Sequence, residues 1–168
     1  MGTSKTPMEL ADKFQVMSKL IPGANTDAVA ASALVYKNGV LAAARSDVGG
    51  DLRMSWSGRN LKLGARFQTY SKGASSFAIL TPRPAGVWSV LSNGSEAHDI
   101  YAGAKRPGRK RRNGKKQLKI GGQFAGVMVP HPGTPGKRTW QKGIKAAETP
   151  ARRVNRLAYS RTLSKVFR

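Results

Sequence analysis

Residues 121–140 read GGQFAGVMVPHPGTPGKRTW, and this stretch decides how the C-terminal half of the chain is built. Residues 117–129 are apolar and strand-like, and the Gly121-Gly122 pair predicts a bulge or bend within that strand. Pro132 has a fixed φ angle, and Gly133 can adopt the positive φ angles that tight turns require. Together they predict a well-defined turn. Nine of the fifteen residues from 105 to 119 are basic. We therefore interpret this stretch as the return of a basic arm to the core.

Positive charge is concentrated in that arm and in the residues that follow it. The 168-residue chain carries a net charge of +22. Residues 1–104 hold 11 Lys or Arg and 7 Asp or Glu, whereas residues 105–168 hold 19 Lys or Arg and a single acid, Glu148. An asymmetry of this size indicates an anionic partner: nucleic acid, an acidic protein surface or a membrane surface.

Composition limits the other possibilities. An apolar fraction of 39% predicts one domain with a modest core. The chain has no cysteine, which excludes disulfides and thiolate metal sites. No apolar run approaches the roughly 18–20 residues that span a bilayer. The N-terminus, MGTSKTPMEL, lacks an apolar signal core, so we expect no secretion by that route.

The N-terminal region predicts two helices within residues 6–46. Thr6 is a good N-cap for a helix over residues 7–20, with Pro7 at its first position and Glu9 in its first turn. Ile21-Pro22-Gly23 is expected to stop this helix. One apolar stripe at helical spacing lies on it: Leu10, Phe14, Met17 and Leu20.

The second predicted helix covers residues 26–46. Val29, Ala33, Tyr36, Val40 and Ala44 lie near one face. Its many alanines favour close packing of a neighbouring element, and Gly49-Gly50 is expected to end it.

The remaining elements predict an α+β fold. Short strands are expected over residues 52–56, 64–70, 76–81 and 87–91, and again over 117–129. Short turns between them favour antiparallel hairpins. A helix is then expected from about residue 138, with Trp140, Ile144 and Ala147 on one face. Thr149-Pro150 is expected to interrupt it before a last helix over residues 151–166.

These elements form one predicted domain, residues 1–168. Its parts are the N-terminal helices (6–46), an antiparallel sheet (51–104 and 117–130), a long basic loop (105–116) and a basic C-terminal arm with one or two helices (138–168).

Residues suited to catalysis or metal binding are few. Glu96, His98 and Asp99 are close in sequence, but they lie in a turn and no second ligand cluster is evident. His131 lies between two prolines and is expected to be a turn histidine bonded to backbone. No phosphate-binding loop is present. The sequence therefore predicts a protein that is not an enzyme and that needs no cofactor or metal.

Two basic segments are candidate contact surfaces. The loop has no aromatic residue between its charges, so base stacking is not indicated. A solvated loop, binding to DNA or RNA phosphates and docking on an acidic protein remain open. In the C-terminal segment, arginines alternate with apolar residues, which suits a membrane, a partner protein or the subunit's own core. Packing on the same or a neighbouring subunit is the expectation. The candidate contacts are Lys105, Arg106, Arg109, Lys110, Arg111, Arg112, Lys115, Lys116, Arg152, Arg153, Arg156 and Arg161.

The order of these pieces resembles the small neck proteins of long-tailed bacteriophages, which are called head–tail connector, head–tail joining or tail-completion proteins. GGDLRMSW resembles the start of that family's sheet, and AGVWSVLSNGSEAHDI resembles its strand and Gly-Ser or Gly-Thr turn. Ser92-Asn93-Gly94-Ser95 stands where the family commonly has Glu-x-Gly-Thr. The closing strand, His-Pro-Gly-Thr turn and aromatic residue that opens a helix match at His131, Pro132, Gly133, Thr134 and Trp140.

The resemblance implies a structural virion protein at the head–tail interface, present in the host cytoplasm during assembly. It implies a ring of copies, expected to be a hexamer, between portal or adaptor proteins and tail-terminator or tail-tube proteins. Double-stranded DNA would pass through or end near the lumen. Within that setting we expect the basic segments to dock on acidic proteins, because strong phosphate binding in a channel would hinder genome exit. No membrane contact is expected.

The main alternative is a free nucleic-acid-binding protein of the ribosome-associated or nucleoid type. It predicts that the isolated monomer binds bulk nucleic acid in a salt-sensitive way. A nuclease is disfavoured because the acids are scattered.

Overall fold

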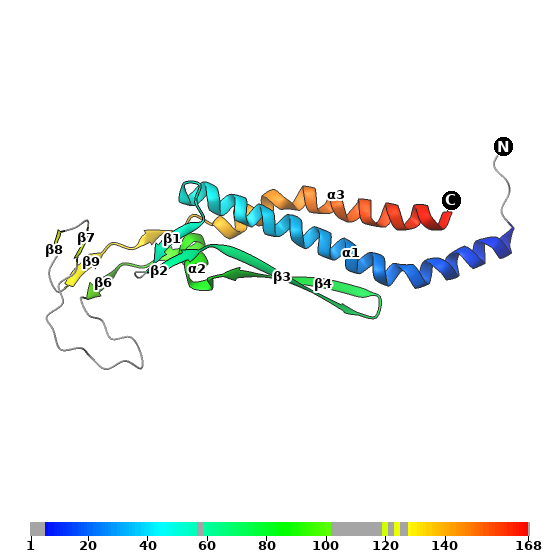
Figure 1. Ribbon diagram of the computed structural model, residues 1–168, viewed down its shortest axis with the longest axis horizontal. Helices are drawn as coiled ribbons and strands as arrows, with labels where there is room; N and C mark the ends of the chain where they lie inside the picture. Colours follow the sequence, from blue (N-terminus) through cyan, green and yellow to red (C-terminus); the bar gives the residue numbers. More distant parts are fainter. Residues whose placement is uncertain (1–5, 57–58, 102–118, 121–122, 125–127, 168) are drawn as a thin grey trace.

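The computed structural model describes residues 6–56, 59–101, 119–120, 123–124 and 128–167. It has an α+β fold drawn out along two long helices that lie side by side and run in opposite directions (Figure 1). Helix α1 is Pro7–Val48, and helix α3 is Thr139–Phe167. The short helix α2, Ala85–Asn93, lies near the end where α1 finishes and α3 begins. The predicted fold class is confirmed.

Helix α1 begins as the sequence predicts. The Thr6 side chain accepts from the Glu9 backbone N–H, and the Glu9 carboxylate accepts from the Thr6 N–H, at 3.3 and 3.1 Å. This reciprocal pair is a capping box, and Pro7 opens the helix. Gly49 ends it in the left-handed conformation, with φ of 81°.

The predicted break at Pro22 is wrong: α1 is one helix of 42 residues that passes through this proline. An interior proline removes a backbone hydrogen bond and costs about 3 kcal/mol. Tertiary contacts just beyond it offset that cost. Asn25 donates to the Ala74 carbonyl and accepts from the Tyr159 hydroxyl, and Thr26 bonds Ser76 at 3.1 Å. Figure 1 shows the helix bending in its blue N-terminal third, as expected near a proline.

The predicted interruption at Pro150 is wrong for the same reason. Helix α3 continues through it, so the C-terminal arm is a single helix. Ala147 and Ala151, one on each side of the proline, are both buried. The Ser32 hydroxyl of α1 also donates to the Ala151 carbonyl at 3.3 Å.

Within the described residues, the strands form five separate antiparallel pairs rather than one sheet. The longest pair is a hairpin of nine-residue strands, β3 and β4, whose register runs from Gly64 opposite Arg83 to Lys72 opposite Ser75. The described strands are β1 Arg53–Trp56 with β2 Arg59–Lys62, β3 Gly64–Lys72 with β4 Ser75–Arg83, β5 Gly94–Ser95 with β10 Thr134–Pro135, β6 His98–Tyr101 with β9 Met128–His131, and β7 Lys119–Ile120 with β8 Gln123–Phe124.

Two strand predictions are corrected. Residues 87–91 lie in helix α2, not in a strand. Val87, Trp88 and Ser92 are the buried residues of this helix, so the segment packs on the core through one side of a helix. Residues 117–129 are not one strand: β7 pairs with β8, so the chain reverses between them. The Gly121-Gly122 pair that was expected to form a bulge lies outside the described residues.

The helices α1 and α3 pack through small side chains. Gly39 of α1 faces α3, where a Cβ on Gly39 would lie 2.7 Å from the Cβ of Ala147. A Cβ on Gly143 would meet the backbone of Val40. Such a seam brings two helix backbones close together. The predicted packing role of the alanines is confirmed at Ala28, Ala33 and Ala44, which are buried.

The core lies at one end of the molecule. Val40, Ala44, Leu52, Leu63, Val87 and Trp88 form its centre, with Trp140 and Ile144 of α3 packed against it. We call this the junction end. The other end holds the first third of α1, the tip of the β3–β4 hairpin and the last turns of α3 (Figure 1). We call it the distal end.

Candidate functional site

The two turn motifs of the sequence meet in the structure. Ser95 pairs with Thr134 and Gly94 pairs with Pro135, so β5 and β10 join segments that lie 39 residues apart. The Thr134 N–H donates to the Ser95 hydroxyl at 3.1 Å. Glycine is required here, because a Cβ on Gly94 would collide with the Thr134 carbonyl, and its φ is +82°. The motifs therefore form one structural unit.

His131 has the role that the sequence predicts. Its Nδ1 accepts a hydrogen bond from the Gly133 backbone N–H at 3.1 Å, across the turn at Pro132. Gly133 has φ of +86°, and a Cβ there would collide with the backbone carbonyl of Ser95. The hydrogen bond to His131 and the close approach of the Ser95 backbone thus shape this turn. The turn leads the chain toward α3.

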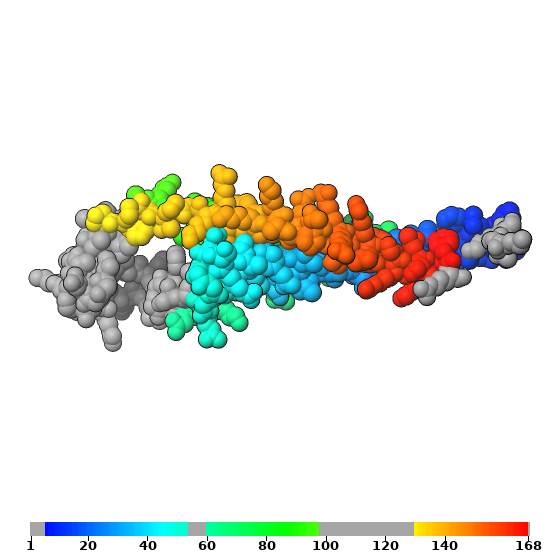
Figure 2. Space-filling view, turned by 90° about the horizontal axis from the view of Figure 1, so that it is seen from above, coloured from blue at the N-terminus to red at the C-terminus, as the bar shows by residue number. Residues whose placement is uncertain are grey.

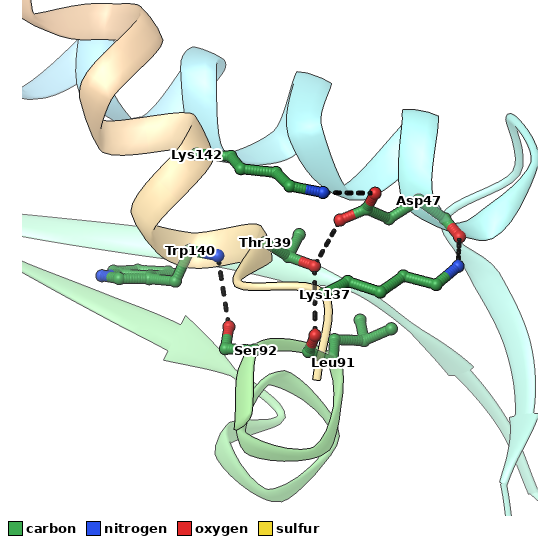
Figure 3. A network of polar contacts seen from close by, with 7 residues as sticks. All are labelled: Asp47, Leu91, Ser92, Lys137, Thr139, Trp140 and Lys142. Carbon is green, nitrogen blue, oxygen red and sulfur yellow. Dashed lines mark hydrogen bonds and ion pairs between the residues drawn. The ribbon is translucent and has the colours of Figure 1, made fainter. Parts of the chain in front are cut away.

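Helix α3 is anchored at its first residue by a polar network that joins three helices (Figure 3). Thr139 is fully buried. Its hydroxyl contacts the Asp47 carboxylate at 2.5 Å and the Leu91 carbonyl at 3.3 Å. Lys142 forms an ion pair with Asp47 at 3.4 Å. Asp47 lies near the end of α1, and Leu91 lies in α2.

Two further contacts complete this junction network. Lys137 donates from its ammonium group to the Asp47 backbone carbonyl at 2.6 Å, and the Trp140 N–H donates to the Ser92 hydroxyl at 3.2 Å. The hydrogen bond from Thr139 lowers the pKa of Asp47, and Lys142 and Lys137 add to this effect, while burial opposes it. The carboxylate is therefore held charged where the three helices meet.

Sequence reasoning missed this network, although one signal was present. A negative charge in the last turn of a helix is unfavourable to the helix dipole. Asp47 occupies that position in α1, so a specific partner was to be expected. Trp140 was singled out correctly: it meets Trp88 edge to face with ring centres 5.3 Å apart. Trp88 is buried and its indole N–H donates to the Gly64 carbonyl at 2.9 Å.

The predicted basic contacts of α3 lie at the surface. Arg152, Arg153, Arg156 and Arg161 are all exposed. Arg152 pairs with Glu148 one turn earlier, at 2.5 Å between side chains that are 72% and 49% exposed. Figure 2 shows α3, in orange and red, running along α1 with side chains projecting away from it. The other eight predicted contacts, in the loop over residues 105–116, lie outside the described residues.

The apolar residues of α3 are divided. Val154 and Ala158 are half-buried, whereas Leu157 and Leu163 are 49% and 44% exposed. Helix α3 uses its small residues, not these leucines, to pack on α1. No helix among the described residues has the length and apolarity to cross a membrane. Nor do the described side chains include three acids or histidines grouped so that they could hold a metal ion.

The distal end exposes large apolar side chains. Leu10, Phe14 and Leu20 of the predicted α1 stripe are 42%, 52% and 40% exposed. On the hairpin, Tyr70 and Phe77 stack on each other with ring centres 5.3 Å apart, and both remain exposed. Alternation along residues 64–70 places Ala65 and Phe67 on the inner side of the hairpin, where they are buried and half-buried. The apolar character of the outer side is not among the predictions from the sequence.

Comparisons of this chain with protein families, with characterised proteins and with solved structures returned no match. The resemblance to phage neck proteins therefore stays a prediction from the residues that carry it.

Proposed function

We propose that this chain is a structural subunit of the phage neck, where copies form a ring that joins the DNA-filled capsid to the tail. The observation that carries the proposal is the exposure of large apolar side chains along a thin, elongated molecule. Exposed apolar surface of this kind is typical of a surface that binds another protein. The resemblance suggests which assembly it belongs to, and the pairing of its two turn motifs supports the resemblance.

The junction network gives each subunit a defined shape. It holds the start of α3 against α1 and α2, so the basic face of α3 has a fixed direction. Exposed arginines in that face can dock on acidic surfaces of portal, adaptor or tail proteins, or on DNA phosphates. Arginine suits both partners because its planar group binds carboxylates and phosphates in pairs of hydrogen bonds.

Electron microscopy of purified particles, with this chain labelled, tests the proposal. The label is expected at the head–tail junction in every finished particle. Absence of the chain from finished particles, or turnover of a substrate by a well-ordered monomer, would overturn the proposal. Replacement of residues 109–112 by alanine or glutamate tests the basic loop: normal assembly and ejection would show that the loop contacts neither DNA nor acidic partners.

The net charge of +22 favours a second candidate, a free nucleic-acid-binding protein. It predicts that the isolated chain binds bulk duplex DNA or RNA, with an affinity that falls steeply between about 50 and 200 mM salt. Alanine at Arg153 and Arg156 would then flatten the salt dependence by about one unit of slope for each lost phosphate contact. Under the neck proposal, such binding is not needed for incorporation into particles.

A further inference from the structure

The apolar stripe of α1 continues the buried face of that helix past the hairpin and beside the last turns of α3 (Figure 1). Leu10, Phe14 and Met17 lie on the same side of α1 as the buried Ala24 and Ala28. Leu20 lies at the edge of this side. We call these four side chains Leu10, Phe14, Met17 and Leu20 the distal stripe. A face of this composition is normally packed against another element.

The chain's own hairpin does not reach the distal stripe. Its tip meets α1 at Asn25, which donates to the carbonyl of Ala74. The next contact, between Thr26 and Ser76, also lies on the core side of the stripe. Figure 1 shows the first part of α1 extending past the end of the hairpin. The last turns of α3 lie nearby, with the Lys13 ammonium 6.0 Å from the centre of the Phe167 ring, but Leu10, Phe14 and Leu20 remain 42%, 52% and 40% exposed. The stripe therefore has room for a partner other than this chain's own hairpin and α3.

The outward side of the same hairpin is a second uncovered surface. Besides the half-buried Gly64, strand alternation and register place nine residues on it, and these nine are exposed. At its centre, Tyr70, Phe77 and Ile79 are 43%, 52% and 50% exposed. We call the whole surface the outer hairpin face: Arg66, Gln68, Tyr70, Lys72, Ser75, Phe77, Ile79, Thr81 and Arg83.

The two surfaces differ in charge within a strongly basic chain. Residues 6–20, which carry the distal stripe, contain two acids and two lysines, a net charge of zero. The hairpin, residues 64–83, contains three basic residues and no acid, and all three lie on its outer face. Two copies at +22 repel each other over most of their surface. Because the first third of α1 is neutral, it can approach a neighbour's basic hairpin without adding to that repulsion.

We propose that copies of this chain associate head to tail, with the distal stripe of one copy packed on the outer hairpin face of the next. The contact joins two different surfaces, so it is heterologous and generates a ring where the rotation closes. The inference rests on the proposed function for its biological setting. Its physical content, one contact between two named surfaces, is tested on the purified chain alone.

Complementation between two variants tests the contact. Leu10→Glu/Phe14→Glu disables the stripe and leaves the hairpin intact, whereas Tyr70→Thr/Phe77→Thr disables the hairpin face and keeps strand-forming residues. All four side chains are exposed, so both variants are expected to fold, which circular dichroism checks. Light scattering with size exclusion is expected to show assemblies for the natural chain and monomers for each variant.

The mixture of the two variants gives the decisive result. One intact stripe and one intact hairpin face remain, so an equimolar mixture is expected to form a one-to-one dimer and nothing larger. The control Met8→Glu/Gln15→Glu places two charges on another side of the same helix and is expected to assemble as the natural chain does. A monomeric mixture, a monomeric natural chain, or a control as defective as the stripe variant would overturn the inference.

Cross-linking gives a second, independent readout. The natural chain has no cysteine, so Phe14→Cys in one copy and Phe77→Cys in another report only the introduced pair. A short bis-maleimide is expected to join the two variants in a mixture, and Met8→Cys with Phe77→Cys is expected to give at least tenfold less product. Equal yields for the two pairs would contradict the proposed contact.

Nucleic acid is the competing occupant of the outer hairpin face, because aromatic and basic residues also suit stacked bases. A fluorescent single-stranded oligonucleotide distinguishes the two. If Tyr70→Thr/Phe77→Thr abolishes oligonucleotide binding and leaves assembly unchanged, the face binds nucleic acid and the inference is wrong. If the complementation succeeds but finished particles lack the chain, the proposed function fails and the contact stands.

Discussion

The junction end and the distal end of this molecule are built on opposite principles. At the junction end, Trp88 and Thr139 are buried and bonded, and three helices meet around them. At the distal end, α1 carries side chains as large as Phe14 with about half of their surface exposed. The same two helices, α1 and α3, run through both ends, so the difference in burial does not come from the type of secondary structure.

The difference lies in what covers each end. The junction end is covered by α2, by two hairpins and by the start of α3. Of the residues that the structure describes, only the tip of one hairpin and the last turns of α3 lie beside the first third of α1 at the distal end (Figure 1). This comparison indicates that the junction end supplies most of the stability of the isolated chain, while the distal end leaves large apolar side chains exposed to solvent.

The largest expected effect is at Trp88. Trp88→Ala removes the largest buried side chain of the described residues and both of its indole hydrogen bonds. The free energy of unfolding is expected to fall by about 3–5 kcal/mol, measured by denaturant titration. Phe14→Ala at the distal end is the matched change, and a loss of similar size there would contradict the division into two ends.

Glycine-to-alanine substitutions are expected to change the free energy of unfolding in opposite directions inside and outside the contact between α1 and α3. Gly143→Ala is expected to lower the free energy of unfolding by about 1–3 kcal/mol, because the new methyl group would meet the Val40 backbone. Gly23→Ala, in the same class of helical position but with open space around it, is expected to raise it by about 1 kcal/mol. Thermal and denaturant unfolding of both variants measures this contrast, and equal signs would show that the seam is not tightly packed.

The junction network predicts a smaller effect at Thr139. Thr139→Val keeps the shape but removes the hydroxyl that donates to Asp47, and the loss is expected to be about 1–2 kcal/mol. Thr139→Ser keeps the donor and is the control, with a smaller expected loss. Unfolding of the two variants at neutral pH separates the hydrogen bond from the packing of the methyl group.

Acid stability tests the same network through Asp47, whose folded-state pKa is lowered mainly by Thr139. A depressed pKa contributes stability above the ordinary pKa of about 4, and this contribution is lost as the pH falls toward the folded-state value. Asp47→Asn is expected to flatten this part of the stability profile between about pH 5 and 2. An unchanged profile would mean that the carboxylate is not held by the network.

The smallest expected effect is at the distal end. Phe14→Ala is expected to change the free energy of unfolding of the monomer by no more than about 0.5 kcal/mol, since the side chain is 52% exposed. The measurement is made at a concentration where light scattering finds only monomer. A change above about 2 kcal/mol would place Phe14 in the core of the subunit and remove it from the proposed contact surface.

Local rules in the sequence predicted the ends of elements better than their interiors. The N-cap at Thr6, the stop at Gly49 and the turn at His131 all follow from a few neighbouring residues, and all are confirmed. Pro22 and Pro150 gave the opposite result. Their local effect is to break a helix, but contacts with residues 50 to 134 positions away outweigh it.

The candidate site was predictable in part, for a related reason. Arg152 and its neighbours were identifiable from charge alone and lie at the surface, and Trp140 was identifiable as a helix anchor. The contact of Asp47 with Thr139 spans 92 residues and requires the fold to be known first. The stacking of Tyr70 on Phe77 likewise depends on hairpin register, which alternation within one strand does not fix.

The segment from Ser95 to Thr134 leaves the rest of the fold and returns to it beside its starting point. The pairing of β5 with β10, next to that of β6 with β9, holds its two ends together. Insertions or deletions between these fastened ends would leave the helices in place, since each doubling of a flexible loop costs only about 0.6 kcal/mol. Proteins that share this frame can thus change the length and charge of the segment between its ends while keeping one scaffold. Relatedness among them would then be easier to detect in the frame, around Gly94 and Gly133, than in the segment that varies.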